Sequence, residues 1–192
     1  MDKKYSRKQF LKLAPLSIQN FLYGEEATES DENNNPIVLR PPGAVQPETL
    51  FLKLCSRCLK CADACPHNAI DFPGMSEGIL ENTPVLHPTE KPCQWCKDFP
   101  CIAACPTGAL AVKPNMSPSI IGIAKIDRDK CSVSQGMICE ICKNACPSSI
   151  KAITTGPDRH PVLDEGKCTG CGLCSYYCDM EPVAIEILKA EY

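Results

Sequence analysis

Sixteen cysteines in 192 residues constrain this chain more than any other feature, because they form four groups of four. The groups begin at steps of 38, 38 and 37 residues, and each closes with a C-x₃-C step. They are Cys55, Cys58, Cys61 and Cys65; Cys93, Cys96, Cys101 and Cys105; Cys131, Cys139, Cys142 and Cys146; and Cys168, Cys171, Cys174 and Cys178. Thiols placed so regularly indicate that the chain repeats the same set of four cysteines, with the same role, four times.

The spacing within the groups favours iron–sulfur ligation over other uses of cysteine. The first group reads C-x₂-C-x₂-C-x₃-C-P, the run that wraps a cubane [4Fe–4S] cluster. Structural zinc prefers two C-x₂-C knuckles a dozen or more residues apart, and a disulfide framework suits a secreted scaffold. The C-x₃-C-x₂-C order of radical-SAM enzymes is absent from the sequence. We therefore expect four [4Fe–4S] clusters, with all sixteen cysteines as iron ligands.

The other three groups differ from this run in their spacing or in the residue after the last cysteine, but each keeps the closing C-x₃-C step. The second group has a gap of four residues, 97–100, and the third has a gap of seven, 132–138. The fourth group lacks the direct Cys-Pro, since Asp179 follows the last cysteine. Gly170 and Gly172 lie between its ligands, where we expect glycine to let backbone N–H groups approach the sulfurs.

The cysteine groups are expected to work in pairs. In two-cluster ferredoxins the fourth cysteine of the run ligates the other cluster, so Cys65 and its equivalents should serve a partner site. Groups one and two share an offset of four residues from their last cysteine to a following alanine, and groups three and four share an offset of six. These offsets favour pairing one with two and three with four. The pairing of one with four and two with three stays open.

Short apolar runs flank the cysteine groups. Runs at 69–72, 109–112, 150–155 and 183–188 follow the groups, and runs at 84–87, 120–126 and 161–163 precede three of them. They predict short strands beside each cysteine loop, with a helical turn carrying the fourth cysteine. Residues 49–54 lack strict alternation and fit a helix.

These elements predict an α+β, loop-rich fold of tandem bacterial ferredoxin-like modules, built as two pseudo-twofold dicluster pairs. Aromatic residues make up 6% of the chain, so a conventional core would be thin. The free energy of metal binding is also free energy of folding, so we expect the clusters to stabilise the fold.

Three segments are expected along the chain. Residues 1–23 form a basic amphipathic segment or a vestigial twin-arginine signal, with Lys8 after Arg7 where the second arginine would stand. Residues 24–47 form a polar, proline-rich linker arm, and residues 48–192 form the four-cluster domain. No stretch approaches the ~18–20 apolar residues of a membrane span. The expected location is cytoplasmic or peripheral to the inner membrane, with a periplasmic location through a degenerate signal as the alternative.

Charge and motifs exclude several classes of function. The formal charge is −3, and four clusters would lower it to roughly −11, which does not suit nucleic acid. Such a charge suits docking on a basic patch of a redox partner. The sequence contains no phosphate-binding loop, no G-x-G-x-x-G and no nucleophile–base pair, so no catalytic residue and no independent enzymatic activity are expected.

Some single residues admit two interpretations. Trp95 either shields a cluster from water or packs in the core. The residues His67, His87 and His160 are expected at the surface or in packing rather than on iron. Lys53, Arg57 and Lys60 either mark a docking face or solvate an ordinary surface.

Several motifs resemble the NapG/MauM-type ferredoxins. They are LRPPGA at 39–44, residues 92–110, Gly136 with residues 139–147, and CTGCG at 168–172. The resemblance implies a four-cluster subunit that relays electrons from a quinol-oxidising membrane partner, a membrane quinol dehydrogenase, to a terminal reductase or cytochrome.

The expected function is thus electron transfer within a multiprotein oxidoreductase. An accessory or maturation ferredoxin for another redox enzyme is the alternative.

Overall fold

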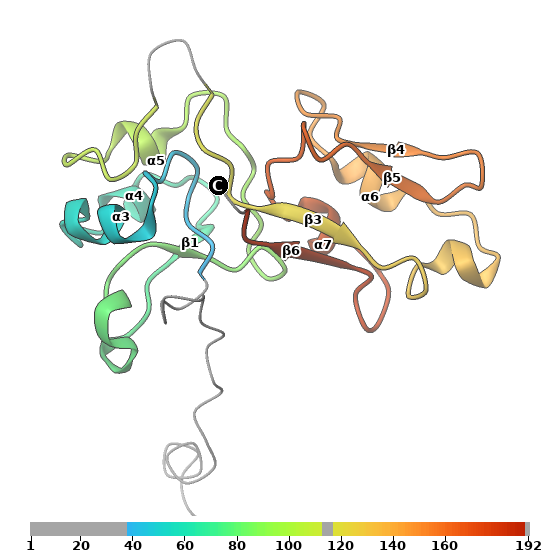
Figure 1. Cartoon of the computed structure of the whole chain (residues 1–192), viewed down its shortest axis with the longest axis horizontal. Helices are drawn as coiled ribbons and strands as arrows, with labels where there is room; N and C mark the ends of the chain where they lie inside the picture. The colour runs from blue at the N-terminus through green and yellow to red at the C-terminus, as the bar shows by residue number, and fades with distance from the viewer. Residues whose placement is uncertain (1–37, 113–116, 191–192) are drawn as a thin grey trace, which may run out of the picture. The chain divides into compact units, whose positions relative to one another are not determined.

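The computed structural model describes residues 38–112 and 117–190 (Figure 1). Val38–Tyr192 form one compact unit. The expected signal-like segment, 1–23, and residues 24–37 of the expected linker lie outside the described residues. The compact unit begins before Glu48, so the described part of the proline-rich stretch belongs to it.

Among the described residues, the strands form three two-stranded antiparallel sheets. Strand β1 (Ile70–Asp71) pairs with β2 (Val85–Leu86), β3 (Ile123–Ile126) with β6 (Ile185–Leu188), and β4 (Ile153–Thr155) with β5 (Pro161–Leu163). All six strands lie within the apolar runs identified in the sequence. The run at 109–112 is different, because it makes an isolated bridge between Leu110 and Ala44 in place of a strand.

The pairing is nested in the same way in both halves of the unit. In the first half the Ala44–Leu110 bridge encloses β1 and β2, and in the second half β3 and β6 enclose β4 and β5. In each half, one cysteine group lies between the first outer segment and the first inner strand. The other group lies between the second inner strand and the second outer segment. The same connectivity therefore occurs twice, each time with two cysteine groups.

Short helices occupy the cysteine loops, and α3 (Glu48–Leu54) precedes the first of them. The helices of the loops are α4 (Lys60–Asp63), α5 (Pro100–Ala103), α6 (Ile141–Ala145) and α7 (Leu173–Tyr176). Of two 3₁₀ segments, η1 (Met75–Leu80) lies between β1 and β2, and η2 (Ser132–Gln135) lies in the loop of cysteine group three.

The helical turn in each cysteine loop carries the third cysteine of its group, so the prediction that it carries the fourth was wrong. The fourth cysteine follows the turn, and in three groups it precedes a proline. A residue before proline is pushed out of the helical region by the proline ring. Cys146 accordingly has φ −65° and ψ 126°, an extended conformation.

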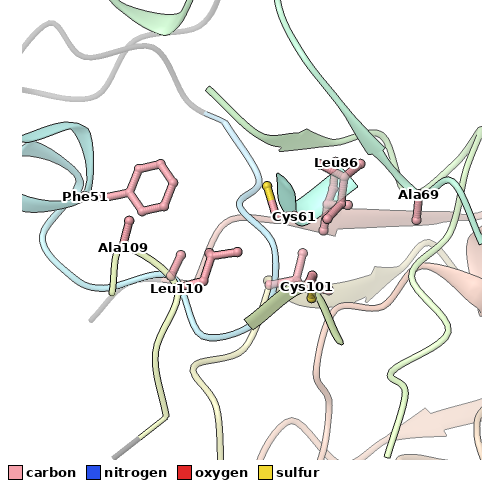
Figure 2. Packing of buried hydrophobic residues seen from close by; sticks show 10 residues of the cluster. Phe51, Cys61, Ala69, Leu86, Cys101, Ala109 and Leu110 are labelled. Carbon is pink, nitrogen blue, oxygen red and sulfur yellow. The ribbon is translucent and has the colours of Figure 1, made fainter. Parts of the chain in front are cut away.

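Cysteine and small residues supply much of the core. In the first half, Cys61 and Cys101 are buried among Ala69, Leu86 and Leu110 (Figure 2). Phe51, on α3, is fully buried in the same cluster. A second cluster in the other half gathers around Cys168 and Cys174. The scarcity of aromatic residues thus leaves the cysteines to form a large part of both cores.

A buried ion pair fixes the proline-rich stretch to the first half. The Arg40 guanidinium donates from Nε to Glu48 Oε1 at 3.0 Å. Its Nη1 donates to Thr83 Oγ1 at 2.9 Å and to the Pro84 carbonyl oxygen at 2.7 Å. It also lies 4.6 Å from the centroid of the Phe51 ring. Arg40 is 4% exposed, and its neighbours satisfy a charge that would otherwise be costly to bury.

Candidate iron–sulfur sites

Four separate pockets are each lined by four cysteines, and together they use all sixteen. Site 1 has Cys55, Cys58, Cys61 and Cys105; site 2 has Cys65, Cys93, Cys96 and Cys101. Site 3 has Cys146, Cys168, Cys171 and Cys174; site 4 has Cys131, Cys139, Cys142 and Cys178. The empty volumes of sites 1 to 4 are about 320, 370, 310 and 330 Å³, so the four pockets are closely similar in size.

Every site takes three cysteines from one group and the last cysteine from another. Cys65 and Cys105 cross between groups one and two, and Cys146 and Cys178 cross between groups three and four. The structure therefore pairs group one with two and group three with four. This is the pairing that the alanine offsets favour.

The pocket walls are apolar, and each surrounds its sulfurs with hydrophobic side chains. Phe51 and Leu110 line site 1, and Leu86 and Phe99 line site 2. In the described residues, no three His, Cys, Asp or Glu side chains converge on one position that would hold a single metal ion. The cysteines instead surround hollows with four sulfur donors each, and four thiolates are the donor set of a [4Fe–4S] cluster.

Backbone amides point at the sulfurs of four cysteines. N–H groups donate to Sγ of Cys65 from Ala69 at 3.5 Å and to Sγ of Cys146 from Ala152 at 3.3 Å. Further N–H groups donate to Cys105 from Leu110 at 3.4 Å and to Cys168 from Ala124 at 3.4 Å. Hydrogen bonds of this kind stabilise negative charge on a ligating sulfur and tune a cluster's potential. The sites thus fit an anionic thiolate set.

The glycines of group four make a different contact from the one expected. Gly170 has φ +68° and its backbone lies against Gly122, while Gly172 has φ +85° and lies against Pro88. A Cβ atom at either position would clash with those neighbours. Close backbone packing, and not an N–H···S bond, is what the structure shows for these two glycines.

Burial favours the protonated thiol at several of the cysteines in the absence of metal. Burial raises the pKa of Cys61, Cys93 and Cys174 to about 12, and that of Cys101 and Cys142 to about 11. Because the thiolate is the ligand, binding of iron must displace these protons. The pockets are therefore adapted to cysteines whose negative charge is balanced by bound iron.

The sites are connected in a fixed order. Sites 1 and 2 share groups one and two, and sites 3 and 4 share groups three and four. Between the halves, the Cys93 N–H donates to the Cys171 carbonyl oxygen at 2.9 Å, which joins the loops of sites 2 and 3. The Ile121 N–H also donates to the Thr169 carbonyl oxygen at 2.9 Å. These contacts connect the sites in the order 1, 2, 3, 4.

Comparison with known proteins agrees with this geometry. The family model described as a 4Fe-4S dicluster domain matches residues 54–109, which contain cysteine groups one and two. The chain is 31% identical to the methylamine utilization ferredoxin-type protein MauM of Methylobacillus flagellatus, over 99% of this chain and 85% of that protein. It is 38% identical to MauM of Methylorubrum extorquens, over 88% of this chain and 79% of the relative.

Similarity extends to the ferredoxin-type protein NapG of Haemophilus influenzae, with 34% identity over 96% of this chain and 72% of that protein. The chain belongs to the MauM/NapG ferredoxin-type family. The resemblance carried by the sequence motifs is thereby confirmed. No solved structure matches the chain. As a [4Fe–4S] protein of this family, the chain has an iron–sulfur electron-transfer role.

The histidines of this MauM/NapG-family protein lie at the surface or in packing contacts. His67 and His87 are exposed, although His67 borders site 2. The Nε2 atom of His160 lies 2.9 Å from Ser134 Oγ, and the residue borders none of the four sites. No described helix is long and apolar enough to cross a membrane.

The aromatic residue beside site 2 is Phe99 rather than Trp95. The two rings meet edge to face with centroids 5.2 Å apart, and Phe99 lines the pocket. Trp95 packs against the first core cluster. Of its two interpretations, shielding of a cluster or packing in the core, the structure therefore supports packing. Phe99 was not singled out from the sequence, although its position two residues before Cys101 is a usable signal, because pocket walls are built from residues near the ligands.

Proposed function

We propose that this ferredoxin-type protein is a four-cluster electron-transfer subunit of a multiprotein oxidoreductase. In this proposal the sixteen cysteines ligate four [4Fe–4S] clusters, one at each site, in two dicluster modules of pseudo-twofold arrangement. The observation that carries the proposal is the crossing of one cysteine between the paired groups at every site, since exchange of the fourth ligand is the signature of two-cluster ferredoxins.

The residue contacts support a relay rather than four independent sites. A bound cluster supplies a one-electron carrier. The chain's own residues hold these carriers in a sequence: shared cysteine groups link sites 1 and 2 and sites 3 and 4, and the Cys93–Cys171 hydrogen bond links sites 2 and 3. The apolar walls shield most of the sulfurs from water, with Cys58 as the exposed cysteine. Sites 1 and 4 are then the ends at which outside partners exchange electrons.

The partners follow from the family resemblance. We propose a quinol-oxidising membrane protein as donor and a terminal reductase or cytochrome as acceptor, with the chain at the cytoplasmic face of the inner membrane. Export to the periplasm is the competing location. Protease added to intact spheroplasts of cells that carry the tagged full-length chain separates the two, because it digests an exported chain and leaves a cytoplasmic chain protected by the inner membrane.

The cluster count is tested by anaerobic purification followed by iron and acid-labile sulfide analysis. About 16 iron atoms per chain are expected from four cubanes. Potentiometric EPR then counts and orders the redox centres. A protein that is loaded with zinc and free of iron would contradict the proposal, and about 8 iron atoms per chain would reduce it to one dicluster module.

The relay role is tested separately from the cluster count. Reduction of the loaded protein by a membrane fraction supplied with a quinol, followed by delivery to an added acceptor, supports electron transfer. A protein that binds its partner only as an immature precursor, and that passes no electrons, would instead be an accessory or maturation ferredoxin.

A further inference from the structure

The loop that carries Cys58 brings site 1 to the surface. All sixteen cysteines lie within the described residues, and Cys58 is the one classed as exposed. Its neighbours Arg57 and Leu59 have φ of +55° and +63°, left-handed conformations that L-residues rarely adopt. Cys58 lies between these two residues and is exposed, so the edge of site 1 faces solvent at Cys58.

The Arg57 side chain fixes this loop in place. Its Nε donates to the Glu81 carbonyl oxygen at 3.0 Å and its Nη2 donates to the Ile79 carbonyl oxygen at 3.1 Å. Both acceptors lie at the end of η1, so the loop and η1 form one continuous surface beside site 1. The surface is therefore preformed rather than assembled on binding.

Large apolar side chains are exposed on this surface. Ile79 is 55% exposed, Leu59 39% and Leu54 36%, and they come from η1, from the start of α4 and from the end of α3. Interfaces between proteins typically have an apolar centre and a polar rim. The apolar residues here surround the exposed edge of a redox site.

Cations border the same surface. Lys53, Arg57 and Lys60 are exposed, and residues 53–63 contain one acid, Asp63. Within residues 38–112 and 117–190, neither Lys53 nor Lys60 is in an ion pair. The half-buried Glu81 accepts a hydrogen bond from Asn82. Residues 53–60 thus carry three cations and no acid, on a chain whose formal charge is −3.

We propose that this surface, called here the basic face and formed by Lys53, Leu54, Arg57, Leu59, Lys60 and Ile79, is the docking site of an acidic redox protein that exchanges electrons at site 1. The exchange moves one electron and no atoms, so the partner loses the electron that site 1 gains, or the reverse. This inference rests on the proposed electron-transfer function. It differs from the expectation for the whole chain, whose net negative charge favours a basic partner.

Cytochrome b5, a haem protein with an acidic surface, is a suitable probe. Zero-length carbodiimide coupling joins lysines to carboxylates that are in contact, and mass spectrometry then locates the joined residues. Cross-links to Lys53 and Lys60 are expected, in preference to Lys125 and Lys151, which are also exposed. This readout reports docking without any electron transfer.

Stopped-flow mixing of the reduced, cluster-loaded chain with oxidised cytochrome b5 reports the transfer itself. Electrostatic steering changes association rates by 10- to 1000-fold and is screened by salt. At low ionic strength, K53E/K60E is therefore expected to lower the second-order rate constant about tenfold or more and to flatten its salt dependence. The matched variant K125E/K151E makes the same change in net charge away from the basic face, and we expect it to change the rate less than about twofold.

The apolar centre is tested by Ile79→Ser. This variant is expected to weaken the complex about fivefold while leaving the salt dependence as in the wild type, because it removes contact area and not charge. Equal slowing by the two double variants would show that only net charge matters and would overturn the inference. So would unchanged rates in K53E/K60E, or cross-links that avoid Lys53 and Lys60. A chain that fails to bind iron at all would instead contradict the proposed function.

Discussion

The backbone N–H of Cys93 donates a hydrogen bond to the carbonyl oxygen of Cys171 over 2.9 Å. One residue belongs to site 2 and the other to site 3, so this contact joins the two halves at their redox sites. Gly172, next along the chain, lies against Pro88 in the same contact region. The two halves thus meet through close contact between the backbone at 171–172 and the segment 88–93. This contact depends on the absence of a side chain at Gly172.

Gly172→Ala should therefore destabilise the protein more than Gly136→Ala. The two glycines have nearly the same φ, +85° and +83°, so both variants incur left-handed strain of about 1–2 kcal/mol. A Cβ at 172 would also clash with Pro88, whereas a Cβ at 136 meets nothing within 4 Å. Overpacking adds about 1–3 kcal/mol to the G172A variant alone.

The measurement is anaerobic unfolding in guanidinium, followed by the loss of cluster absorbance. G172A should show the lower midpoint and altered magnetic interaction between clusters in the EPR spectrum. Equal midpoints for the two variants would show that the approach to Pro88 contributes nothing.

Serine substitutions of cysteine should report the crossing of ligands between groups. Cys65 shares site 2 with Cys96, although it lies in group one. Cys65→Ser and Cys96→Ser should therefore perturb the same EPR signal, and each should lower the iron content by up to about 4 atoms per chain.

Cys55→Ser and Cys105→Ser supply the matched comparison, because both cysteines belong to site 1. They should perturb a second signal and leave the first intact. If Cys65→Ser and Cys55→Ser altered one common signal, each cysteine group would bind its own cluster and the crossing would be wrong.

The cysteine pattern allowed the sequence to indicate much of the site, because ligand spacing is a local property. The strands at 70–71, 85–86, 123–126, 153–155, 161–163 and 185–188 also fall in apolar runs that are visible in the sequence. The alanine offsets have a physical basis in part, since Ala69 and Ala152 donate N–H groups to the last cysteines of groups one and three. In group two the donor is Leu110 rather than Ala109, so the offset is not a general rule.

Long-range contacts were beyond the reach of the sequence pattern. Arg40 meets Thr83 across 43 positions of the chain, and no periodicity relates the two. The close approach of Gly172 to Pro88 likewise depends on how the halves pack. The motif at 39–44 could be identified as a family feature, but the role of its arginine followed only from the folded chain.

Glu48→Gln should be strongly destabilising, because it leaves the Arg40 guanidinium buried without its counter-charge. Breaking a buried pair on one side costs about 3–5 kcal/mol, whereas replacing both partners with apolar residues is often neutral. E48Q should thus lower the midpoint of anaerobic unfolding more than the double variant R40M/E48L does.

The Arg40 pair also supports the wall of site 1, because Phe51 and Pro84 both contact Arg40 and line that pocket. Cluster loss from E48Q during unfolding should begin with the EPR signal assigned to site 1. The reverse order of stability, with the double variant weaker than E48Q, would mean that the hydrogen bonds of Arg40 to Thr83 and Pro84 outweigh its pairing with Glu48.

Site 1 should be the first site to be damaged when the protein meets oxygen, since Cys58 is exposed while the cysteines of site 3 are mostly buried. A hydrogen bond from the Ser56 side chain lowers the pKa of Cys58, whereas burial raises that of Cys174 to about 12. Below its pKa a thiol is protonated and unreactive, so at neutral pH a freed Cys58 has the larger thiolate fraction.

Brief exposure to air followed by iodoacetamide labelling and peptide mass spectrometry should therefore find Cys58 modified before Cys174. Ser56→Ala removes the hydrogen bond and should slow the labelling of Cys58 at neutral pH, with less effect at a pH above the ordinary thiol pKa, where both proteins carry the thiolate. Simultaneous labelling of the two cysteines would mean that the clusters are lost together in global unfolding, and that exposure at Cys58 gives site 1 no separate vulnerability.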